Sequence, residues 1–219
     1  MADWRQMPYT LTHAYAYALS HSNELIGAVG RHLALVGVAL GIAILVCVPL
    51  GVWTSRSRAA SLAAVNAFNA LRVVPSLAIL FLAIPYLGLT FTAAITALTV
   101  LALPPVLINT DAAFRGIDHA IREAAFGMGM TSWQVLRRVE IPLALPVVVA
   151  GIRTAAVEVI ASATLSAFVG AGGLGLYVIR GFALYDNSIL LVGAVPVAVL
   201  ALLAQISMSA LQRGVQPPT

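Results

Sequence analysis

The stretch LALVGVALGIAILVCVPLGVW, residues 33–53, contains no charged side chain. A helix needs about 20 apolar residues to cross the ~30 Å hydrocarbon core of a bilayer, and this stretch supplies them. The rest of the chain has the same character, since 61% of its 219 residues are hydrophobic and only 9% are charged. A soluble domain has about 25% charged residues. The composition therefore predicts a membrane protein.

Other apolar runs predict four more spans. The second begins near Ala60 and continues through VVPSLAILFLA, where Pro75 can break or kink it. The uncharged segment 73–110 is too long for one crossing, so a turn is expected within IPYLGLT, residues 84–90. Spans are then expected at 91–108 (bent near its two prolines), 143–168 and 187–212. Without the ~10-residue alternation of a membrane barrel, the predicted fold class is an all-α polytopic membrane protein with about five transmembrane helices.

The stretch GAGGLG, Gly170–Gly175, matches the G-x-G-x-x-G fingerprint of dinucleotide-binding folds. That fingerprint has meaning only between a strand and a helix of a βαβ unit, whereas here it follows a membrane span. We interpret the match as a coincidence. The glycines are expected to allow a tight turn and close backbone packing on the external side of the fourth span.

Several chemistries are excluded by residues that the chain lacks. All 12 basic residues are arginine, so the chain has no lysine for a P-loop or a Schiff base. One cysteine, Cys47, cannot form a disulfide framework or a thiol zinc site, and the four histidines lack ligand spacing. The arginines form no basic stripe, so nucleic acid is not an expected partner. We expect no catalytic residue, metal or cofactor in this chain, and no enzymatic activity.

The arginines also predict the orientation in the membrane. Cytoplasmic loops carry an excess of positive charge. If the loop 111–142 is cytoplasmic, seven arginines lie inside and two outside, which places the N-terminus outside and the C-terminus in the cytoplasm. Residues 1–30 are then an external, partly helical lead-in at the interface, and residues 31–213 form the transmembrane domain. The inside set is Arg56, Arg58, Arg115, Arg122, Arg137, Arg138 and Arg213, and the outside set is Arg5 and Arg180.

Residues 111–140 hold eight charges and are expected to be an aqueous segment. Asp118 is a plausible N-cap for a helix beginning at HAIREAAF, and Gly129 offers a sharp bend at its end. The following SWQVLRRVEIP predicts a second short helix stopped by Pro142. The segment is therefore expected to form two short helices at an angle, with Glu123 exposed.

The pattern Glu123-Ala124-Ala125, then Gly129, then Val139-x-Ile141-Pro142 resembles the EAA signature, E-A-A-x3-G-x9-I-x-L-P, of permease subunits of bacterial ABC importers. Val139 and Ile141 replace the usual Ile and Leu. The longer stretch 123–175 is similar to permeases for osmoprotectants such as glycine betaine, carnitine and choline. Methionine permeases share the general plan, so a methionine or other small amino-acid permease is the alternative.

This resemblance implies a cytoplasmic coupling helix, a type I importer permease fold and a set of partners in the bacterial cytoplasmic membrane. The partners are a second permease, identical or homologous, two P-loop ATPase subunits that use the ATP, and an extracytoplasmic binding protein. The implied ATPase-coupling residues are Glu123, Ala124, Ala125, Gly129 and Pro142. A stand-alone, ion-driven transporter would be expected to show internal repeats, and such a protein would have no use for the EAA loop.

Ionisable residues within spans are functional candidates because a buried charge is costly unless it is paired or hydrated. Arg153 and Glu158 do not face each other on one helix, so each is expected to pair with another span, and Arg72 with Glu158 is one possibility. Hydroxyl side chains in spans can instead bond to their own helix. The candidates for a polar translocation pathway are Asn66, Asn69, Arg72, Glu158, Ser162 and Thr164.

Overall fold

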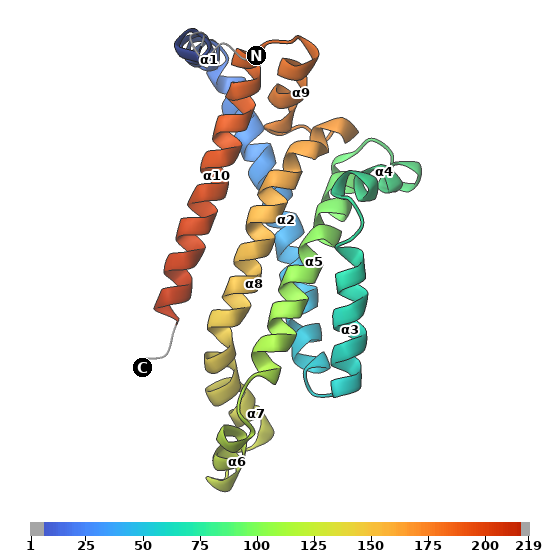
Figure 1. Ribbon diagram of the computed structural model, residues 1–219, viewed down its shortest axis with the longest axis vertical. Helices are drawn as coiled ribbons and strands as arrows, with labels where there is room; N and C mark the ends of the chain where they lie inside the picture. The colour runs from blue at the N-terminus through green and yellow to red at the C-terminus, as the bar shows by residue number, and fades with distance from the viewer. Residues whose placement is uncertain (1–6, 216–219) are drawn as a thin grey trace. The chain divides into compact units, whose positions relative to one another are not determined.

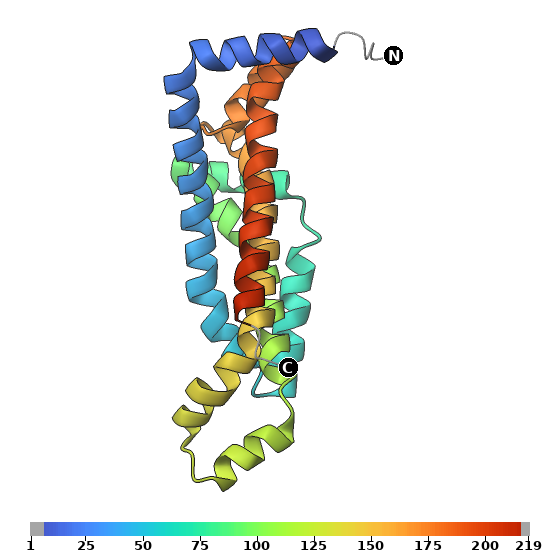
Figure 2. The same ribbon diagram turned by 90° about the vertical axis from the view of Figure 1, so that its left-hand side faces the viewer.

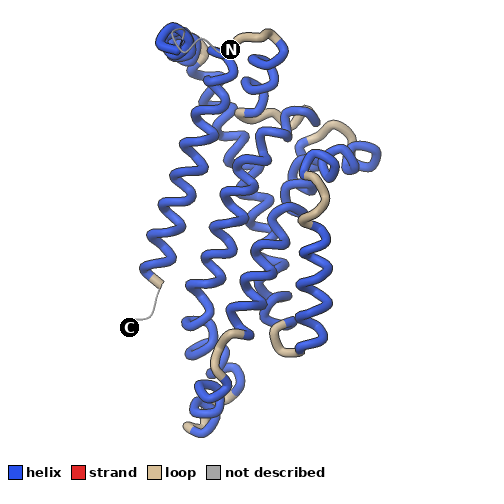
Figure 3. Tube along the Cα trace, viewed as in Figure 1, coloured by secondary structure: helices blue, strands red, loops and turns tan. Residues whose placement is uncertain are grey.

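The computed structural model describes residues 7–215, which form helices joined by short turns (Figure 1). No strand occurs within that range, as Figure 3 shows, so the all-α prediction is confirmed. The helices are α1 Met7–Ser20, α2 Ser22–Thr54, α3 Arg58–Leu71, α4 Ser76–Leu87, α5 Phe91–Arg115, α6 His119–Gly127, α7 Ser132–Val135, the π-helix η2 Leu136–Glu140, α8 Ile141–Ser162, the 3-10 helix η3 Ala163–Val169, α9 Gly175–Ala183 and α10 Asn187–Gly214.

Four helical runs among the described residues are long and apolar enough to cross a membrane: α2, α5, the continuous run Ser132–Val169 and α10. Helices α3 and α4 reach that hydropathy only as a pair, and the chain bends by 88° at the break between them. Pro75 is the N-cap of α4, so the break lies where the sequence predicts it. Counting the bent pair as one span gives the five spans expected.

The chain divides into two compact units. Unit 1 consists of Met1–Ala39, Pro75–Leu98 and Glu158–Leu203, and unit 2 of Leu40–Val74, Thr99–Val157 and Ala204–Thr219. Within unit 1, α1 runs across the direction of α2 (Figure 2). A core of Ala14, Tyr177, Ile189 and Val192 joins α1 to α9 and α10. The lead-in is helical over Met7–Ser20 and from Ser22, where α2 begins, and its external position at the interface stays a prediction.

Small residues bring the helices of unit 2 together. A Cβ added at Gly151 in α8 would lie 2.5 Å from the Cβ of Asn109 and 2.8 Å from the carbonyl oxygen of Pro105, both in α5. A Cβ at Gly51 in α2 would lie 2.7 Å from the Cβ of Thr110. Close backbone approach of this kind is how helices pack in lipid, where there is little hydrophobic force between them.

The prediction that Pro142 stops a short helix is wrong. Helix α7 continues through η2 into α8, and the backbone N–H of Ile141 bonds to the carbonyl of Leu136, five residues back. A proline in an α-helix lacks the N–H and collides with the carbonyl four residues back. The π-type turn just before Pro142 shifts the bonding register, so the helix accommodates the ring and runs on. The fourth span is therefore part of a helix that begins at Ser132.

The two predicted glycine turns are confirmed. Within residues 84–90, α4 ends at Leu87 and is followed by its C-cap Gly88, which has φ +69°. In the GAGGLG stretch, Gly170, Gly172 and Gly173 all have positive φ. A Cβ at Gly175 would lie only 1.9 Å from the carbonyl oxygen of Thr164, so η3 and α9 pack backbone to backbone. The sequence did not predict η3 or α9 as separate helices.

Candidate functional site

Helices α6 and α7 form a pair joined by a turn at residues 128–131, called here the α6–α7 pair (Figure 1). Asp118 caps α6, since its carboxylate accepts a hydrogen bond from the backbone N–H of Ala120 at 2.9 Å. Thr131 and Gln134 cap α7 reciprocally in a capping box. Gly129 takes φ +82° in the turn between the helices. The predicted cap and bend are confirmed, whereas the second helix is not short, because it continues through η2 into α8.

The signature residues lie on different faces of the α6–α7 pair. The Glu123 side chain is 68% exposed, and its carboxylate lies 3.3 Å from the imidazole of His119 one turn earlier. Ala124 is exposed, whereas Ala125 is buried. Neighbouring residues on a helix point about 100° apart, so the two alanines lie on different faces of α6. Ala125 instead packs inward and supports α6.

Large apolar side chains are exposed on the same pair. Phe126, Met128 and Trp133 are 49%, 74% and 65% exposed. Exposed apolar groups of this size, set among charged residues, are typical of protein–protein contact surfaces. Sequence reasoning missed these three residues, although the amphipathic pattern of the segment contains them. A cleft of about 430 Å³ lies beside them, lined by Arg56, Arg122, Phe126, Ser132, Trp133, Val135, Leu136 and Glu140.

A buried carboxylate holds the α6–α7 pair to the rest of unit 2. Glu140 Oε1 accepts hydrogen bonds from Arg56 Nη1 at 2.8 Å and from Arg122 Nε at 2.6 Å, and Oε2 accepts a second bond from Arg56. The hydrogen bond with Glu140 raises the pKa of Arg56, so this guanidinium stays charged. The resulting cluster, Arg56–Glu140–Arg122, connects the α2–α3 turn, α6 and η2.

Arg122 also anchors α6 to the end of α5. Its guanidinium donates hydrogen bonds to the carbonyl oxygens of Ile117, at 3.2 Å, and Phe114. Together with the bond to Glu140, these contacts use all three nitrogens of the guanidinium as donors. The start of α6 is thus fixed by a charged side chain as well as by the Asp118 cap.

A second buried carboxylate, Asp111, lies near the end of α5. It accepts hydrogen bonds from Thr54 Oγ1 at 2.9 Å and from Ser61 Oγ at 2.7 Å, and Arg115 lies 3.5 Å from it. The expectation that residues 111–140 are aqueous throughout is therefore wrong at both ends, because Asp111 and Glu140 are buried in protein. Apart from Arg115, the partners of Asp111 lie at least 50 positions away, as Arg56 does from Glu140, so no local pattern identifies their burial.

The candidate pathway residues belong to different units. Asn66, Asn69 and Arg72 are exposed at α3 in unit 2, whereas Glu158, Ser162 and Thr164 are half-buried in unit 1. Thr164 donates to the carbonyl of Ala161 in its own chain segment at 2.7 Å, the alternative expected for a hydroxyl in a span. The pathway roles and the Arg72–Glu158 pair remain predictions.

Arg153 behaves as expected for an ionisable residue within a span. Its guanidinium donates a hydrogen bond to Ser209 Oγ at 3.1 Å, which connects α8 to α10. The expectation that Arg153 pairs with another span is confirmed. The contact is also consistent with a structural role, since it joins two long helices within unit 2.

Comparison with known proteins places these features in a family. The model of the binding-protein-dependent transport system inner membrane component matches residues 47–217. The chain is 39% identical over 198 residues to the glycine betaine/carnitine/choline transport system permease protein OpuCB of Bacillus subtilis (strain 168), covering 90% of this chain and 91% of the relative. It is 42% identical over 199 residues to the carnitine transport permease protein OpuCB of Listeria monocytogenes, with 90% of each covered.

A solved structure supports the same assignment. The permease fold is similar to a chain of the inward-facing MetNI methionine ABC transporter, with a TM-score of 0.79 and 26% identity over 88% of this chain and 96% of the other. The relatives that match are transport components and not enzymes. The chain belongs to the family of binding-protein-dependent transport system inner membrane components, and it is the permease subunit of an ABC importer.

Proposed function

We propose that this chain, together with a second permease that is identical or homologous, forms the translocation pathway for a compatible solute such as glycine betaine, carnitine or choline. The observation that carries the proposal is the 39–42% identity, over nine-tenths of the chain, to relatives named for these solutes. The methionine transporter of similar fold is only 26% identical. A methionine or other amino-acid permease is therefore the second candidate.

Two cytoplasmic ATPase subunits and an extracytoplasmic binding protein would complete the complex. The chain has no lysine, so the P-loop that binds the β- and γ-phosphates of ATP must lie in another subunit. This chain would bind no cofactor itself. Its α6–α7 pair would dock on the ATPase, with the exposed Glu123 as the charged contact and the exposed Phe126 and Trp133 as apolar ones.

Movement of the docked pair would then reach the spans through buried contacts. The Arg56–Glu140–Arg122 cluster connects α6 to η2, which continues directly into α8. Separating buried, hydrogen-bonded charges is costly, so a displacement of α6 is passed on to η2 and to the α2–α3 turn. ATP binding can shift the permease between inward- and outward-open states only through such differential contacts. Ala124, Gly129 and Pro142 would shape the docking segment itself.

The complex would lie in the bacterial cytoplasmic membrane, with the N-terminus of this chain outside and its C-terminus inside. Several apolar helices of spanning length and the inner-membrane family support the membrane location. The excess of arginine on the α6–α7 side supports the orientation.

Reversing the charge of Glu123 tests the coupling role. We expect Glu123→Arg to lower both solute uptake and solute-stimulated ATPase activity at least tenfold, while the amount of folded permease in the membrane stays unchanged because the side chain is exposed. Asp118→Asn is the matched control, since it removes a charge from the same segment but keeps an N-cap. Uptake by Glu123→Arg equal to that of the control would contradict the proposal.

Uptake by a deletion strain carrying the complex tests the substrate class. Labelled glycine betaine, carnitine and choline are expected to accumulate in an ATP-dependent manner, and labelled methionine is not. Accumulation of methionine alone would favour the second candidate. Uptake driven by an ion gradient, without a co-purifying ATPase, would instead identify a secondary transporter.

A further inference from the structure

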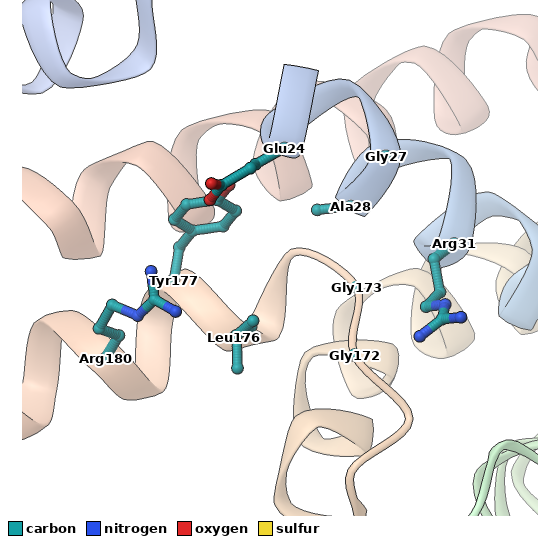
Figure 4. Close-up of a pocket in the computed structure, with 9 residues that line it drawn as sticks. All are labelled: Glu24, Gly27, Ala28, Arg31, Gly172, Gly173, Leu176, Tyr177 and Arg180. Atoms are coloured by element: carbon teal, nitrogen blue, oxygen red, sulfur yellow. The ribbon is translucent and has the colours of Figure 1, made fainter. Parts of the chain in front are cut away.

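Unit 1 contains a groove that none of the roles above uses. It has a volume of about 450 Å³ and lies between the beginning of α2 and the GAGGLG turn with the helix α9 that follows it (Figure 4). We call it the Arg31 groove. Its lining residues are Glu24, Gly27, Ala28, Arg31, Gly172, Gly173, Leu176, Tyr177 and Arg180.

Three charged side chains line the Arg31 groove without compensating one another. Glu24, Arg31 and Arg180 are exposed, and none of them forms a hydrogen bond or an ion pair through its side chain with the part of the chain that the structure describes. Two guanidinium groups and one carboxylate leave the groove with a net positive charge. In Figure 4, Arg31 lies at one end and Glu24, Tyr177 and Arg180 lie at the other.

The Arg31 side chain lies along the glycine turn. A Cβ added at Gly172, which has φ +78°, would lie 2.9 Å from Cδ of Arg31. A hydrogen bond holds the turn in place, because the buried Ser166 donates to the carbonyl of Gly172 at 3.3 Å. On its other side, the turn packs against His32. The backbone of the turn along which Arg31 lies is therefore held by contacts within unit 1.

The Arg31 end of the groove suits an anion, and at the other end Glu24, which lies on the same side as Arg180, supplies the one carboxylate of the lining. A guanidinium presents a planar set of N–H donors that matches a carboxylate. At the other end, the Glu24 carboxylate lies near Tyr177. Burial is the main cause that raises the pKa of the Tyr177 phenol, and the negative charge of Glu24 raises it further. An exposed carboxylate attracts a cationic group, so Glu24 can accept the ammonium group of a solute.

We propose that the Arg31 groove binds a zwitterionic solute, with its carboxylate on Arg31 and its ammonium group at Glu24. The choice of solute rests on the proposed function, because the relatives are named for glycine betaine and carnitine, which carry both charges, and for choline, which carries only the positive one. The net positive charge, to which Arg180 contributes, disfavours choline. Exposed ion pairs are weak, so the expected affinity is millimolar, which suits a loading site.

The place of the groove on α2 fits such a role. Arg31 lies in the first third of α2, just before the uncharged stretch 33–53 of this candidate span. The groove is therefore at the N-terminal end of the span. In the proposed orientation that end is external, where solute arrives.

Direct binding to the whole complex in lipid nanodiscs, without binding protein, tests the inference. Labelled glycine betaine and carnitine are expected to bind saturably at millimolar concentration, and choline at least fivefold more weakly. Arg31→Gln is expected to weaken glycine betaine binding at least fivefold. Arg213→Gln, at an exposed arginine in the last turn of α10, is the control and should leave binding unchanged.

Glu24→Gln distinguishes specific binding of a zwitterion from a general effect of surface charge. It adds one unit of positive net charge, so acetate should compete more strongly than in the native complex, while glycine betaine loses its ammonium contact and binds at least threefold more weakly. A diffuse charge effect would move both ligands in the same direction, which would overturn the proposal. So would native binding that neither Arg31→Gln nor Glu24→Gln changes, or the absence of direct solute binding.

Two further outcomes remain distinct from these. If the variants change only the stimulation of ATPase by the binding protein, with no solute bound directly, the groove is a docking surface for that protein and the proposal fails. In proteoliposomes supplied with binding protein, ATP-driven uptake of glycine betaine without groove binding overturns this inference alone. Absence of uptake of every osmoprotectant overturns the proposed function, while groove binding stays measurable.

Discussion

The Glu140 side chain is almost fully buried, with both carboxylate oxygens engaged by arginines. A buried ion pair contributes little net stability compared with apolar packing, but removing one partner leaves the others uncompensated. Arg56 is 45% exposed, so water can take over part of its solvation, whereas Arg122 is only 22% exposed. The carboxylate is therefore needed mainly by Arg122, which holds α6.

We expect Glu140→Gln to lower the free energy of unfolding by about 1–3 kcal/mol, less than the full cost of breaking a buried pair because Arg56 can be hydrated. Unfolding of the purified permease in detergent, followed by thermal or denaturant titration, measures this. Glu123→Gln, an exposed acid of the same segment, should change stability by less than about 0.5 kcal/mol. Equal stability of the two variants would show that the cluster holds nothing in place.

Residues whose role depends on near neighbours were predictable, and the others were not. Asp118 caps the helix that begins one residue later, and Glu123 lies on the polar face of that helix, so both follow from local pattern. Glu140 and Arg56 are 84 positions apart, and Asp111 and Thr54 are 57 apart. Asp111 and Glu140 lie in a polar segment, so the sequence predicted that they face water. Their burial could not be predicted, because only the folded chain brings their distant partners to them.

At the scale of the elements, the longest helix was the hardest to delimit. Proline usually ends a helix, so the stretch before Pro142 was expected to be separate from the fourth span. The π-type turn at Leu136–Glu140 joins them and places Glu140 where both arginines reach it. Such turns are frequent at functional sites. Here it makes a continuous helical connection between the α6–α7 pair and α8.

The contact between η3 and α9 depends on one glycine. A Cβ at Gly175 would lie 1.9 Å from a backbone oxygen, which cannot move aside as a side chain can. We expect Gly175→Ala to destabilise unit 1 by at least about 1–3 kcal/mol, the range for overpacking, and to reduce the yield of folded protein. The melting temperature in detergent and the folded fraction in gel filtration measure both effects.

Gly30→Ala is the control for Gly175→Ala. Gly30 lies within α2, and an added Cβ there meets no atom within 4 Å. Alanine has the higher helix propensity, so this variant should be neutral or more stable by up to about 1 kcal/mol. If both variants melt at the same temperature, the close approach of η3 and α9 has no energetic weight.

For the whole molecule, the surface of the longest helices is largely apolar. Of the 18 most apolar consecutive residues, only 28% in α2 and 17% in α10 are buried within the chain, compared with 50% in α5. Exposed apolar surface on this scale requires lipid or a partner subunit to cover it. A chain of this kind is a component of a larger membrane assembly, as its family implies.

The proposed orientation can be measured with thiols, because the native Cys47 is fully buried. Met128→Cys in the α6–α7 turn and Leu184→Cys after α9 both replace exposed residues. With the N-terminus outside, a membrane-impermeant maleimide added to intact cells should label Leu184→Cys and not Met128→Cys. Met128→Cys should react only after the cells are permeabilised. The reverse pattern would contradict the orientation, and labelling of the native chain is the background control.

The sequence by itself determined that this is an all-helical membrane permease, and it located the break at Pro75 and the turns at Gly88 and Gly129. These features follow from the solvent that the composition requires and from backbone preferences within a few residues. The tertiary structure alone decided which alanine faces inward, which charges are buried and how the helix passes Pro142. Those outcomes depend on side chains that meet only after the helices pack, because a buried charge is tolerated only where folding supplies its partner.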